Sequence, residues 1–452
     1  MNMGGPAQNL DDALSVLQIG AIEKKHDYDD YYVNTMPSRV SENGNDVIEM
    51  MYFSISRAKD PCRILYSGHM GSGKSTELFR LRTKLAENNF FVCYANIEGK
   101  LDFTTLTHTD LLIFILETLL EYARANELDV DDRKLTGIKD YLRSEHEKIR
   151  ASSGLTQSEL EASLEAKTPK LLSAVLSIVG NLRASMQIQS DYREVWRENM
   201  KPDINTYIGM INDVLADVKD AAAKKGKADA YPIILLDSLE KIDEEPAMTL
   251  FRAHSQDLAR LYANMVISFP IGLTYMSDFN QIENYYADIQ TLPMIKLRTW
   301  NQNERVYENE NEPPENLPGC QVLKKMILKR VDDSLMDEGV LSLIVLKTGG
   351  FIRDLLYAVY YATLNALAGG RGRIEMRDAK VALTKMRSDI SKRFDKEGFE
   401  RLKIIIGGEK VYHSDAPLMK LLQCGAALEY NGTRWVDAHP LVVEWMEENG
   451  MI

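Results

Sequence analysis

Short apolar runs separated by helical patterns mark the first part of the chain. Residues 63–67 (RILYS) and 90–97 (FFVCYANI) predict strands, and residues 75–86 between them predict a helix. The run YPIILL at residues 231–236 is apolar throughout, which is typical of a central strand buried on both faces of a parallel sheet. A strand–helix–strand order of this kind predicts an α/β fold with a parallel sheet.

Two further runs extend the predicted sheet. Residues 265–275 predict a fourth strand, and we expect Pro270 to end it because proline does not belong inside a central strand. Residues 294–297 predict a short fifth strand. The acidic, proline-bearing segment at residues 301–319 then predicts a loop at a domain boundary.

A long helical block separates the second and third predicted strands. We interpret it, at about residues 105–228, as a helical insertion into the sheet domain. Its predicted helices lie at residues 111–125, 140–149, 171–182 and 207–223. The apolar stretch at residues 171–182 is interpreted as core packing, with docking of a partner as the alternative.

The C-terminal part predicts helices followed by a hairpin. Two apolar and aromatic runs flank Asn431-Gly432, which is the strongest short-range hairpin signal. Helices followed by such a hairpin are typical of a winged-helix domain. The predicted organisation is therefore an N-terminal arm (residues 1–50), an α/β core (51–300) that contains the insertion, a helical lid (301–375) and a winged-helix domain (376–452).

Composition places the chain among globular proteins. It has 452 residues, of which 45% are hydrophobic and 27% charged. The sequence contains no apolar run of the roughly 18 residues that a membrane span needs, and no signal-peptide pattern, so we expect a cytoplasmic protein with no membrane contact. The four cysteines have neither metal-ligand nor redox spacing and predict reduced thiols: Cys62, Cys93, Cys320 and Cys424.

The charge balance bears on nucleic-acid binding. A net charge of −13 argues against coating of DNA by the whole surface. Residues 353–410, however, carry 13 Lys or Arg against 8 Asp or Glu. We interpret this stretch as a solvated helical surface and keep a local DNA-binding patch as the alternative.

Residues 68–75 (GHMGSGKS) match the phosphate-binding pattern G-x-x-x-x-G-K-[ST] in every position. They follow a predicted strand and precede a predicted helix, which is the context that the pattern requires. The backbone N–H groups of such a loop point at phosphate oxygens, the lysine reaches the β- and γ-phosphates, and the hydroxyl binds Mg²⁺. The predicted nucleotide-binding residues are Gly68, His69, Met70, Gly71, Ser72, Gly73, Lys74, Ser75 and Thr76. His69 and Met70 are expected to contribute their backbone only.

An acidic pair follows the third predicted strand. Asp237 comes directly after the run of residues 231–236, at the strand end where parallel α/β sheets bind ligands, and is predicted to hold Mg²⁺ together with Ser75. Glu240 is the candidate to orient or deprotonate the attacking water. The alternative for Glu240 is an acid at a helix N-terminus that the helix dipole stabilises.

These motifs resemble the AAA+ and STAND branch of P-loop ATPases, and within it bacterial ATPases similar to origin-recognition proteins. GHMGSGKSTEL resembles the Walker A box, ILLDSLEKID the Walker B segment, and SFPIGLTY the fourth strand that leads to sensor 1. TGGFIRDLLYAVYYA resembles the sensor-2 helix, and LLQCGAALEYNGTRWVDAHPLV the winged helix. DYYVNTMPSR, at residues 30–39, is weakly similar to the segment that packs on adenine.

The resemblance implies a P-loop NTPase sheet with a helical insertion, a helical lid and a C-terminal winged helix. It also implies that Arg353, on the lid, approaches the γ-phosphate; the alternative is an arginine paired with Asp354. The usual arginine finger is missing, since residues 276–295 contain no Lys or Arg. Arg252 and Arg260 could substitute from a neighbouring subunit. Arg193 and Arg197 are interpreted as a solvated helix face, with phosphate or a partner as the alternative.

The sequence thus predicts an ATPase, slow or triggered by a partner, with Lys74, Glu240 and Arg353 as catalytic residues and ATP, ADP and Mg²⁺ as ligands. It would act as a nucleotide-dependent switch or assembly module, as a homo-oligomer or with a partner protein. The resemblance implies a role in phage defence or mobile-element biology. The alternatives are an ATP-gated DNA loader that uses the winged helix and a scaffold that binds ATP without hydrolysing it.

Overall fold

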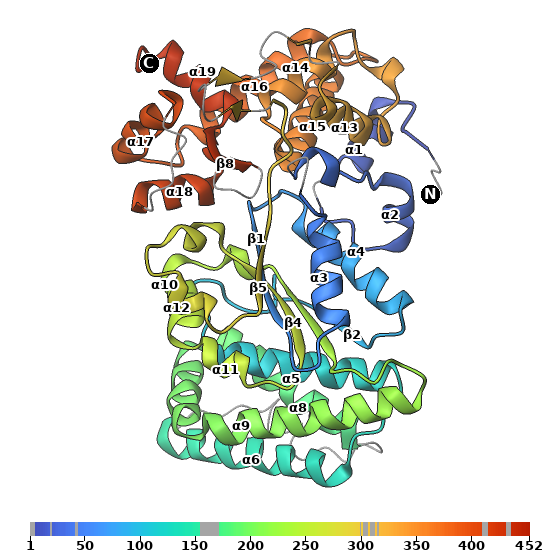
Figure 1. Ribbon diagram of the computed structural model, residues 1–452, viewed down its shortest axis with the longest axis vertical. Helices are drawn as coiled ribbons and strands as arrows, with labels where there is room; N and C mark the ends of the chain where they lie inside the picture. Colours follow the sequence, from blue (N-terminus) through green and yellow to red (C-terminus); the bar gives the residue numbers. More distant parts are fainter. Residues whose placement is uncertain are drawn as a thin grey trace.

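A computed structural model of the chain describes residues 5–18, 20–40, 44–153, 171–298, 300–301, 306–307, 312–313, 316–408, 415–430 and 435–452. Figure 1 shows a parallel sheet in the middle of the molecule, with a stack of long helices below it and two helical units above it. The sheet and the long helices are called the base here.

The central sheet has five strands in the order β2-β3-β4-β1-β5, and every neighbouring pair is parallel. A parallel sheet with this crossover order confirms the predicted α/β P-loop fold. The strands are β1 (Arg63–Gly68), β2 (Val92–Asn96), β3 (Ile233–Asp237), β4 (Asn264–Phe269) and β5 (Asp288–Leu292).

The fifth strand was predicted at the wrong residues. β5 comprises residues 288–292 rather than 294–297, and it lies at the sheet edge, where most of its side chains are only half buried. Because an edge strand carries polar positions, it leaves no apolar run in the sequence. Met294 instead pairs with Tyr430 in an isolated bridge. Pro270 does end β4, and a 3₁₀ helix (Ile271–Tyr275) follows where the strand was expected to continue.

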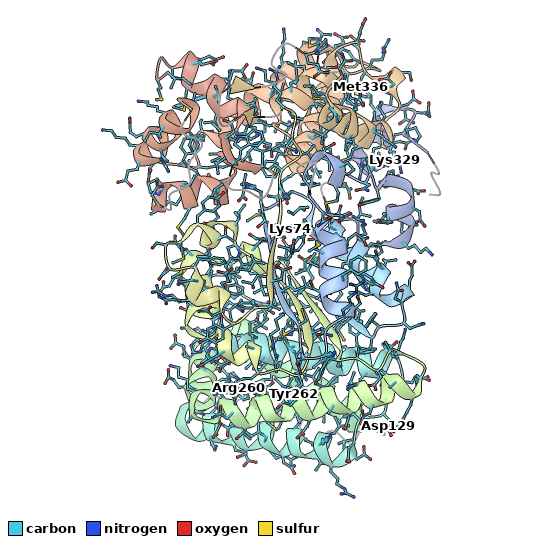
Figure 2. The ribbon with its side chains drawn as sticks, in the orientation of Figure 1. Lys74, Asp129, Arg260, Tyr262, Lys329 and Met336 are labelled. Atoms are coloured by element: carbon cyan, nitrogen blue, oxygen red, sulfur yellow. The ribbon has the colours of Figure 1, made fainter. Side chains whose placement is uncertain are left out.

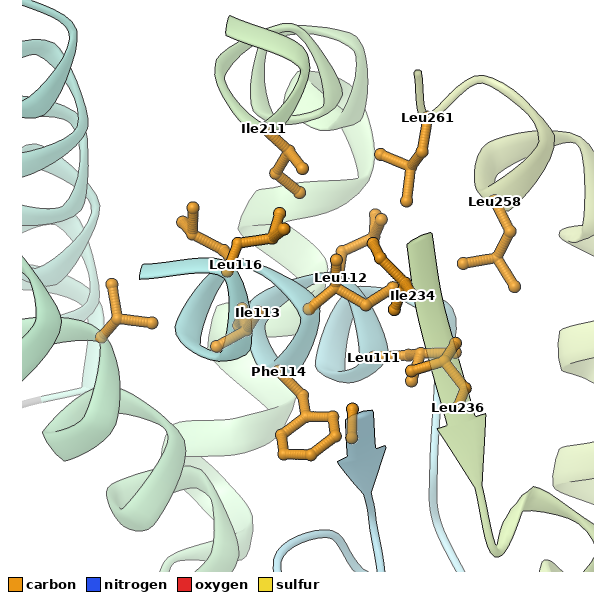
Figure 3. Close-up of a cluster of buried hydrophobic side chains, with 14 of the residues drawn as sticks. Leu111, Leu112, Ile113, Phe114, Leu116, Ile211, Ile234, Leu236, Leu258 and Leu261 are labelled. Carbon is orange, nitrogen blue, oxygen red and sulfur yellow. The ribbon is translucent and has the colours of Figure 1, made fainter. Parts of the chain in front are cut away.

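The helical insertion covers one face of the sheet. Its helices are α5 (His108–Ala125), α6 (Asp132–Ser153), α8 (Leu171–Ile188) and α9 (Ser190–Lys224). Figure 3 shows Leu111 and Leu112 of α5 packed against Ile234 and Leu236 of β3. The apolar stretch at residues 171–182 belongs to this core, as predicted. The opposite face is covered by α3 (Val47–Ser56) and α4 (Lys74–Glu87).

Two properties of the insertion differ from expectation. By length and composition α8 is apolar enough to cross a membrane, although a helix packed in a protein core passes the same test. The arginines of α9 do not form a solvated face. Arg193 pairs with Asp102 at 3.0 Å, and Arg197 pairs with Asp110 at the start of α5. These ion pairs fix α9 to the segment that follows β2.

The lid and the winged-helix unit share one apolar core. The lid helices are α13 (Pro318–Leu328), α14 (Val340–Lys347) and α15 (Ile352–Ala368), and α16 (Met376–Ile390) packs against both α15 and the winged-helix unit. The predicted boundary at residues 375–376 is therefore not a break in packing. The winged-helix unit comprises α17 (Lys396–Ile406), α18 (Ala416–Cys424), β8 (Ala427–Tyr430), β9 (Trp435–Ala438) and α19 (Pro440–Glu448). β8 and β9 form the predicted antiparallel hairpin, whose Asn431-Gly432 turn lies outside the described residues.

Short elements connect these units. Residues 239–292 contain a 3₁₀ helix (Leu239–Lys241), α10 (Glu244–Met248), a π-helical turn (Thr249–Ala253), α11 (Ser255–Ala259) and α12 (Asn280–Glu283). Further along the chain lie β6 (Trp300–Asn301), β7 (Val306–Tyr307) and a 3₁₀ helix (Asp333–Leu335).

The N-terminal segment is more than the polar arm that the sequence predicted. Helix α1 (Leu10–Val16) buries Leu10 and Ala13 in the core of the lid. Its apolar residues are too few to give a strong pattern, so the sequence did not indicate this packing. Helix α2 (Lys25–Tyr31) and a 3₁₀ helix (Met36–Ser38) then lead to the base.

The chain passes between lid and base twice, and the two passages lie side by side. The amide of Lys296 donates to the carbonyl of Ser38 at 2.8 Å, and its ammonium donates to the carbonyl of Val40 at 2.6 Å. The guanidinium of Arg39 also donates to the carbonyl of Pro293. Residues 38–40 and 293–296 therefore form one hydrogen-bonded crossing.

Candidate functional site

The phosphate-binding loop connects β1 to α4 at the upper edge of the sheet, where Figure 2 labels Lys74. Gly68, Gly71 and Gly73 all have positive φ, at 144°, 92° and 104°, a region that side chains disfavour. At Gly71 space is limited as well, because an added Cβ would lie 2.5 Å from Nε of Arg353. The loop conformation therefore requires glycine at these positions.

Lys74 is the first residue of α4 and is almost fully buried. Its ammonium donates to the carbonyls of Gly68 at 2.9 Å and His69 at 3.0 Å, and it lies 3.2 Å from Oε1 of Glu240. Burial lowers the pKa of Lys74, and the carboxylate of Glu240 opposes this effect. Lys74 is thus a buried cation at the phosphate-binding loop, and it is already paired with Glu240, the acid predicted to act on water.

Asp237 ends β3 and is fully buried. Its carboxylate accepts hydrogen bonds from the Tyr94 hydroxyl at 2.6 Å and from the Ser238 amide at 2.8 Å, and the Ser75 hydroxyl also bonds to it. Burial, together with the charge of Glu240, raises the pKa of Asp237. A serine hydroxyl touching a buried carboxylate is an all-oxygen donor set, which fits Mg²⁺.

Glu240 lies on the 3₁₀ helix that follows Ser238, a non-glycine residue with φ of 73°. Burial raises the pKa of Glu240, but the Lys74 ammonium, together with hydrogen bonds to the carboxylate from its own backbone and from Ser268, holds this pKa below its usual range. Among the described residues, Oε2 of Glu240 has no hydrogen-bond partner. Glu240 lies in the first turn of this 3₁₀ helix, as the alternative expected, and its carboxylate also faces Lys74.

Arg353 is the second residue of α15, and the lid brings it onto the phosphate-binding loop. Its amide donates to the carbonyl of Gly71 at 3.3 Å, and its side chain covers the Cα of the same glycine. Burial lowers the pKa of Arg353. Asp354, the alternative partner, lies 3.2 Å from His439 of the winged-helix unit.

A cavity of about 340 Å³ joins Lys74, Ser75, Glu240 and Arg353, whereas the fully buried Asp237 does not line it. Pockets of roughly 300–1,000 Å³ are typical of small-molecule sites. Besides Lys74, Ser75, Glu240 and Arg353, the N-terminal segment and the lid contribute walls to it, through Gly20, Ala21, Ile22, Glu23, Tyr31, Tyr32 and Arg330. The cavity therefore lies between base and lid, with a strap of residues 20–23 across it.

Two residues that order this site were not predicted from the sequence. Arg39 is 1% exposed and donates to the hydroxyl of Thr35 at 2.8 Å and to the carbonyl of Ser72, inside the loop, at 2.6 Å. Tyr94 lies on the strand beside β3, donates to Asp237 and lies 3.1 Å from Glu23 of the strap. The weak similarity of residues 30–39 was the only signal for the first, and nothing in the sequence marked the second.

No family model matches the chain, and neither does any curated protein. Among solved structures, Cdc6p from Pyrobaculum aerophilum matches with 11% identity over 94% of this chain and 97% of that one, at a TM-score of 0.37. The Walker-type ATPase paby2304 of Pyrococcus abyssi matches with 11% identity over 96% and 99%, at 0.45. The Aeropyrum pernix ORC1 protein in complex with DNA matches with 11% identity over 96% of each chain, at 0.37.

These structures include proteins of the kind that the sequence motifs resemble. The P-loop fold of this chain rests on its own sheet order and on the loop between β1 and α4. At such low identities and TM-scores the likeness carries no argument about activity. What the site can do chemically rests on the geometry above.

Arg252 and Arg260, the arginines predicted to act on a neighbouring subunit, do not line this cavity. Arg252 pairs with Asp278 at 2.6 Å, and Arg260 donates to Asn205 at 2.7 Å. Figure 2 shows Arg260 near the base helices, below Lys74. Both side chains are partly exposed, so an intermolecular contact stays a prediction.

Proposed function

We propose that this chain binds ATP with Mg²⁺ in the cavity between base and lid and hydrolyses it. The observation that carries this proposal is the convergence of groups from three segments: Lys74 and Ser75 of the phosphate-binding loop, Asp237 at the end of β3 with Glu240 just after it, and Arg353 of the lid. These are the groups that phosphoryl transfer to water requires.

Each residue has a defined part in the proposed reaction. Lys74 neutralises the β- and γ-phosphates, and Ser75 with Asp237 would hold Mg²⁺, which neutralises developing charge on the phosphate oxygens. Glu240 orients the attacking water through Oε2 and accepts its proton. Arg353 stabilises charge on the γ-phosphate, so the lid contacts ATP through a group that ADP does not offer. A contact present in only one nucleotide state is what a conformational switch requires.

The first measurement is ATP turnover by the purified chain with Mg²⁺, with EDTA, and as Lys74→Ala, with bound nucleotide and mass determined on the same samples. Turnover that needs Mg²⁺ and Lys74 supports the ATPase. Higher-order assembly with ATP would support an oligomer with an arginine supplied by a neighbouring subunit. Retained nucleotide without turnover would favour the ATP-binding scaffold, and a sample that neither binds nor hydrolyses nucleotide would contradict the proposal.

DNA loading through the winged helix is less favoured by the ion pairs of the described residues. Many basic residues between residues 371 and 403 are matched with acids, among them Arg371 with Asp378, Arg377 with Glu375, Lys385 with Asp389, Arg387 with Glu448 and Arg401 with Asp415. A cation held by a neighbouring carboxylate must leave it before it can neutralise a DNA phosphate, which weakens the electrostatic attraction to DNA. Roles in phage defence or mobile-element biology and a cytoplasmic location stay predictions.

A further inference from the structure

His69 occupies the second position of the phosphate-binding loop, yet its side chain contacts the winged-helix unit. Its Nδ1 lies 3.0 Å from the carbonyl oxygen of Leu422, at the end of α18. Its Nε2 accepts a hydrogen bond of 2.8 Å from the amide of Glu429 in β8. The side chain of His69, for which the sequence indicated no role, thus forms two hydrogen bonds to the winged-helix unit.

These two hydrogen bonds define the state of the imidazole. Nε2 faces a donor and must carry the lone pair, so the proton lies on Nδ1 and is donated to Leu422. Only the neutral ring satisfies both partners. The side chain is 1% exposed, and burial together with Lys74 lowers the pKa of His69 to about 3.

β8, the strand that His69 contacts, is also hydrogen-bonded to the base and to the lid. The amide of Met294, just after β5, donates to the carbonyl of Glu429 at 2.9 Å. The hydroxyl of Tyr430 donates to the carbonyl of Gly349 in the lid at 2.7 Å. The amide of Glu429 is thus bound by the phosphate-binding loop, and its carbonyl by the end of the central sheet.

The backbone of His69 also contacts Lys74, the residue that is proposed to bind phosphate. Its carbonyl accepts hydrogen bonds from the ammonium of Lys74 and from the amide of Ser72, both at 3.0 Å. A phosphate that takes the ammonium of Lys74 would remove one of these bonds. One residue therefore connects the lysine that senses phosphate to the strand that docks the winged helix.

We propose that His69 is a positioning residue that couples the nucleotide state of the loop to docking of the winged-helix unit. This inference rests on the proposed function, because it requires that nucleotide binds. ATP draws Lys74 away from the His69 carbonyl, the peptide shifts, and the imidazole loosens its hold on Leu422 and Glu429. Linkage makes the effect reciprocal, so release of the winged helix raises nucleotide affinity by the same factor.

The test is hydrogen exchange of the full-length protein, followed by mass spectrometry of peptides that cover residues 427–430. It compares the nucleotide-free state with the Mg²⁺ complex of a non-hydrolysable ATP analogue, and calorimetry on the same samples reports binding. In the wild type we expect exchange at β8 to become at least about fivefold faster with nucleotide, the lower end of typical allosteric couplings. In His69→Ala, exchange is fast in both states and the response to nucleotide is lost.

Two variants separate coupling from general loosening. Tyr430→Phe removes a hydrogen bond to the lid without touching the loop, so exchange rises but the response to nucleotide remains. His69→Gln can still donate and accept, and it recovers part of the response. An equal response in His69→Ala and wild type would overturn the coupling while nucleotide binding stands. Absence of nucleotide binding in wild type, seen by calorimetry, would instead overturn the proposed function and the coupling with it.

Discussion

The ammonium of Lys74 and the carboxylate of Glu240 lie 3.2 Å apart, and the two side chains are 2% and 5% exposed. Each offsets a charge that would otherwise be buried alone. Their pairing links the residue expected to bind phosphate with the residue expected to act on water, so a change in one alters the electrostatics of the other.

Substitution of Lys74 should therefore affect stability as well as activity. Lys74→Ala leaves the Glu240 carboxylate without its partner, and breaking a buried pair in this way costs about 3–5 kcal/mol. We expect urea unfolding to show a loss of this order and ATP turnover to vanish. The double variant Lys74→Met/Glu240→Gln should regain most of the stability and none of the turnover. A Lys74→Ala protein as stable as the wild type would contradict the pairing.

Removal of the charge from Glu240 should separate binding from hydrolysis. Glu240→Gln keeps the shape of the side chain but cannot accept a proton, and loss of a general base typically lowers the rate by about 10²–10⁴-fold. We expect single-turnover measurements to show ATP retained and cleavage slowed by this factor. Glu244→Gln, an exposed acid at the start of α10, is the matched control and should turn over at close to the wild-type rate.

Arg353 should discriminate ATP from ADP. Arg353→Ala removes the lid cation beside Gly71, so we expect the affinity for the ATP analogue to fall and that for ADP to change much less. Loss of a group that stabilises transition-state charge costs about 10²–10³ in rate. Calorimetry with both nucleotides and turnover assays measure these effects. Arg373→Ala, an exposed lid arginine, is the control, and an equal loss for both nucleotides would contradict contact with the γ-phosphate.

Arg39 should be indispensable to the shape of the phosphate-binding loop. Arg39→Met leaves three acceptors, on Thr35, Ser72 and Pro293, without their donor in a buried site. Each buried group left unsatisfied costs about 1–3 kcal/mol, so we expect a loss of at least about 3 kcal/mol in unfolding free energy and weaker nucleotide binding. Arg133→Met, at an exposed position of α6, should change stability by less than about 0.5 kcal/mol.

The neutral imidazole of His69 predicts a pH dependence. Because its folded pKa, about 3, lies below the ordinary 6.5, the unfolded chain binds more protons between these values. The contribution of the neutral imidazole to the free energy of unfolding is complete above pH 6.5 and is lost as the pH falls toward 3. At pH 5 the loss is about 2 kcal/mol. Other charged groups lie near it, namely Lys74 and, around an adjoining cavity, Arg353, Asp354 and Arg393; Cys424 also lines that cavity.

The measurement is therefore a difference in unfolding free energy between wild type and His69→Gln at several pH values. Glutamine forms the same kinds of hydrogen bond but does not titrate, so the other groups cancel. The advantage of the wild type should shrink steadily from pH 6.5 to pH 5. An advantage that is independent of pH over this range would contradict the buried neutral ring.

The sequence was informative about features that depend on residues close together in the chain. The phosphate-binding loop, Asp237 after its apolar strand and the C-terminal hairpin each carry a local pattern. The side chain of His69 carries none, since its partners lie 353 and 360 residues away and any residue type can fill its position in the loop pattern. Arg39 had only the weak similarity of residues 30–39, and one of its partners, Pro293, lies 254 residues away. The edge strand β5 was misplaced for a related reason, because half-buried positions do not need apolar side chains.

The crossing at residues 38–40 and 293–296 has a mechanical consequence. Two bodies joined at well-separated points resist rotation, whereas two connections bound to each other act as a single pivot. Rotation of the lid about this pivot would leave both connections intact, but it would have to break the contacts of Arg353 with Gly71 and of His69 with the winged-helix unit. Arg353 and the strap at residues 20–23 border the cavity beside the pivot, where a modest rotation changes the opening that a nucleotide must pass. Stapling residues 38–40 to 293–296 would leave this rotation intact, whereas bridging the lid to the loop would block it.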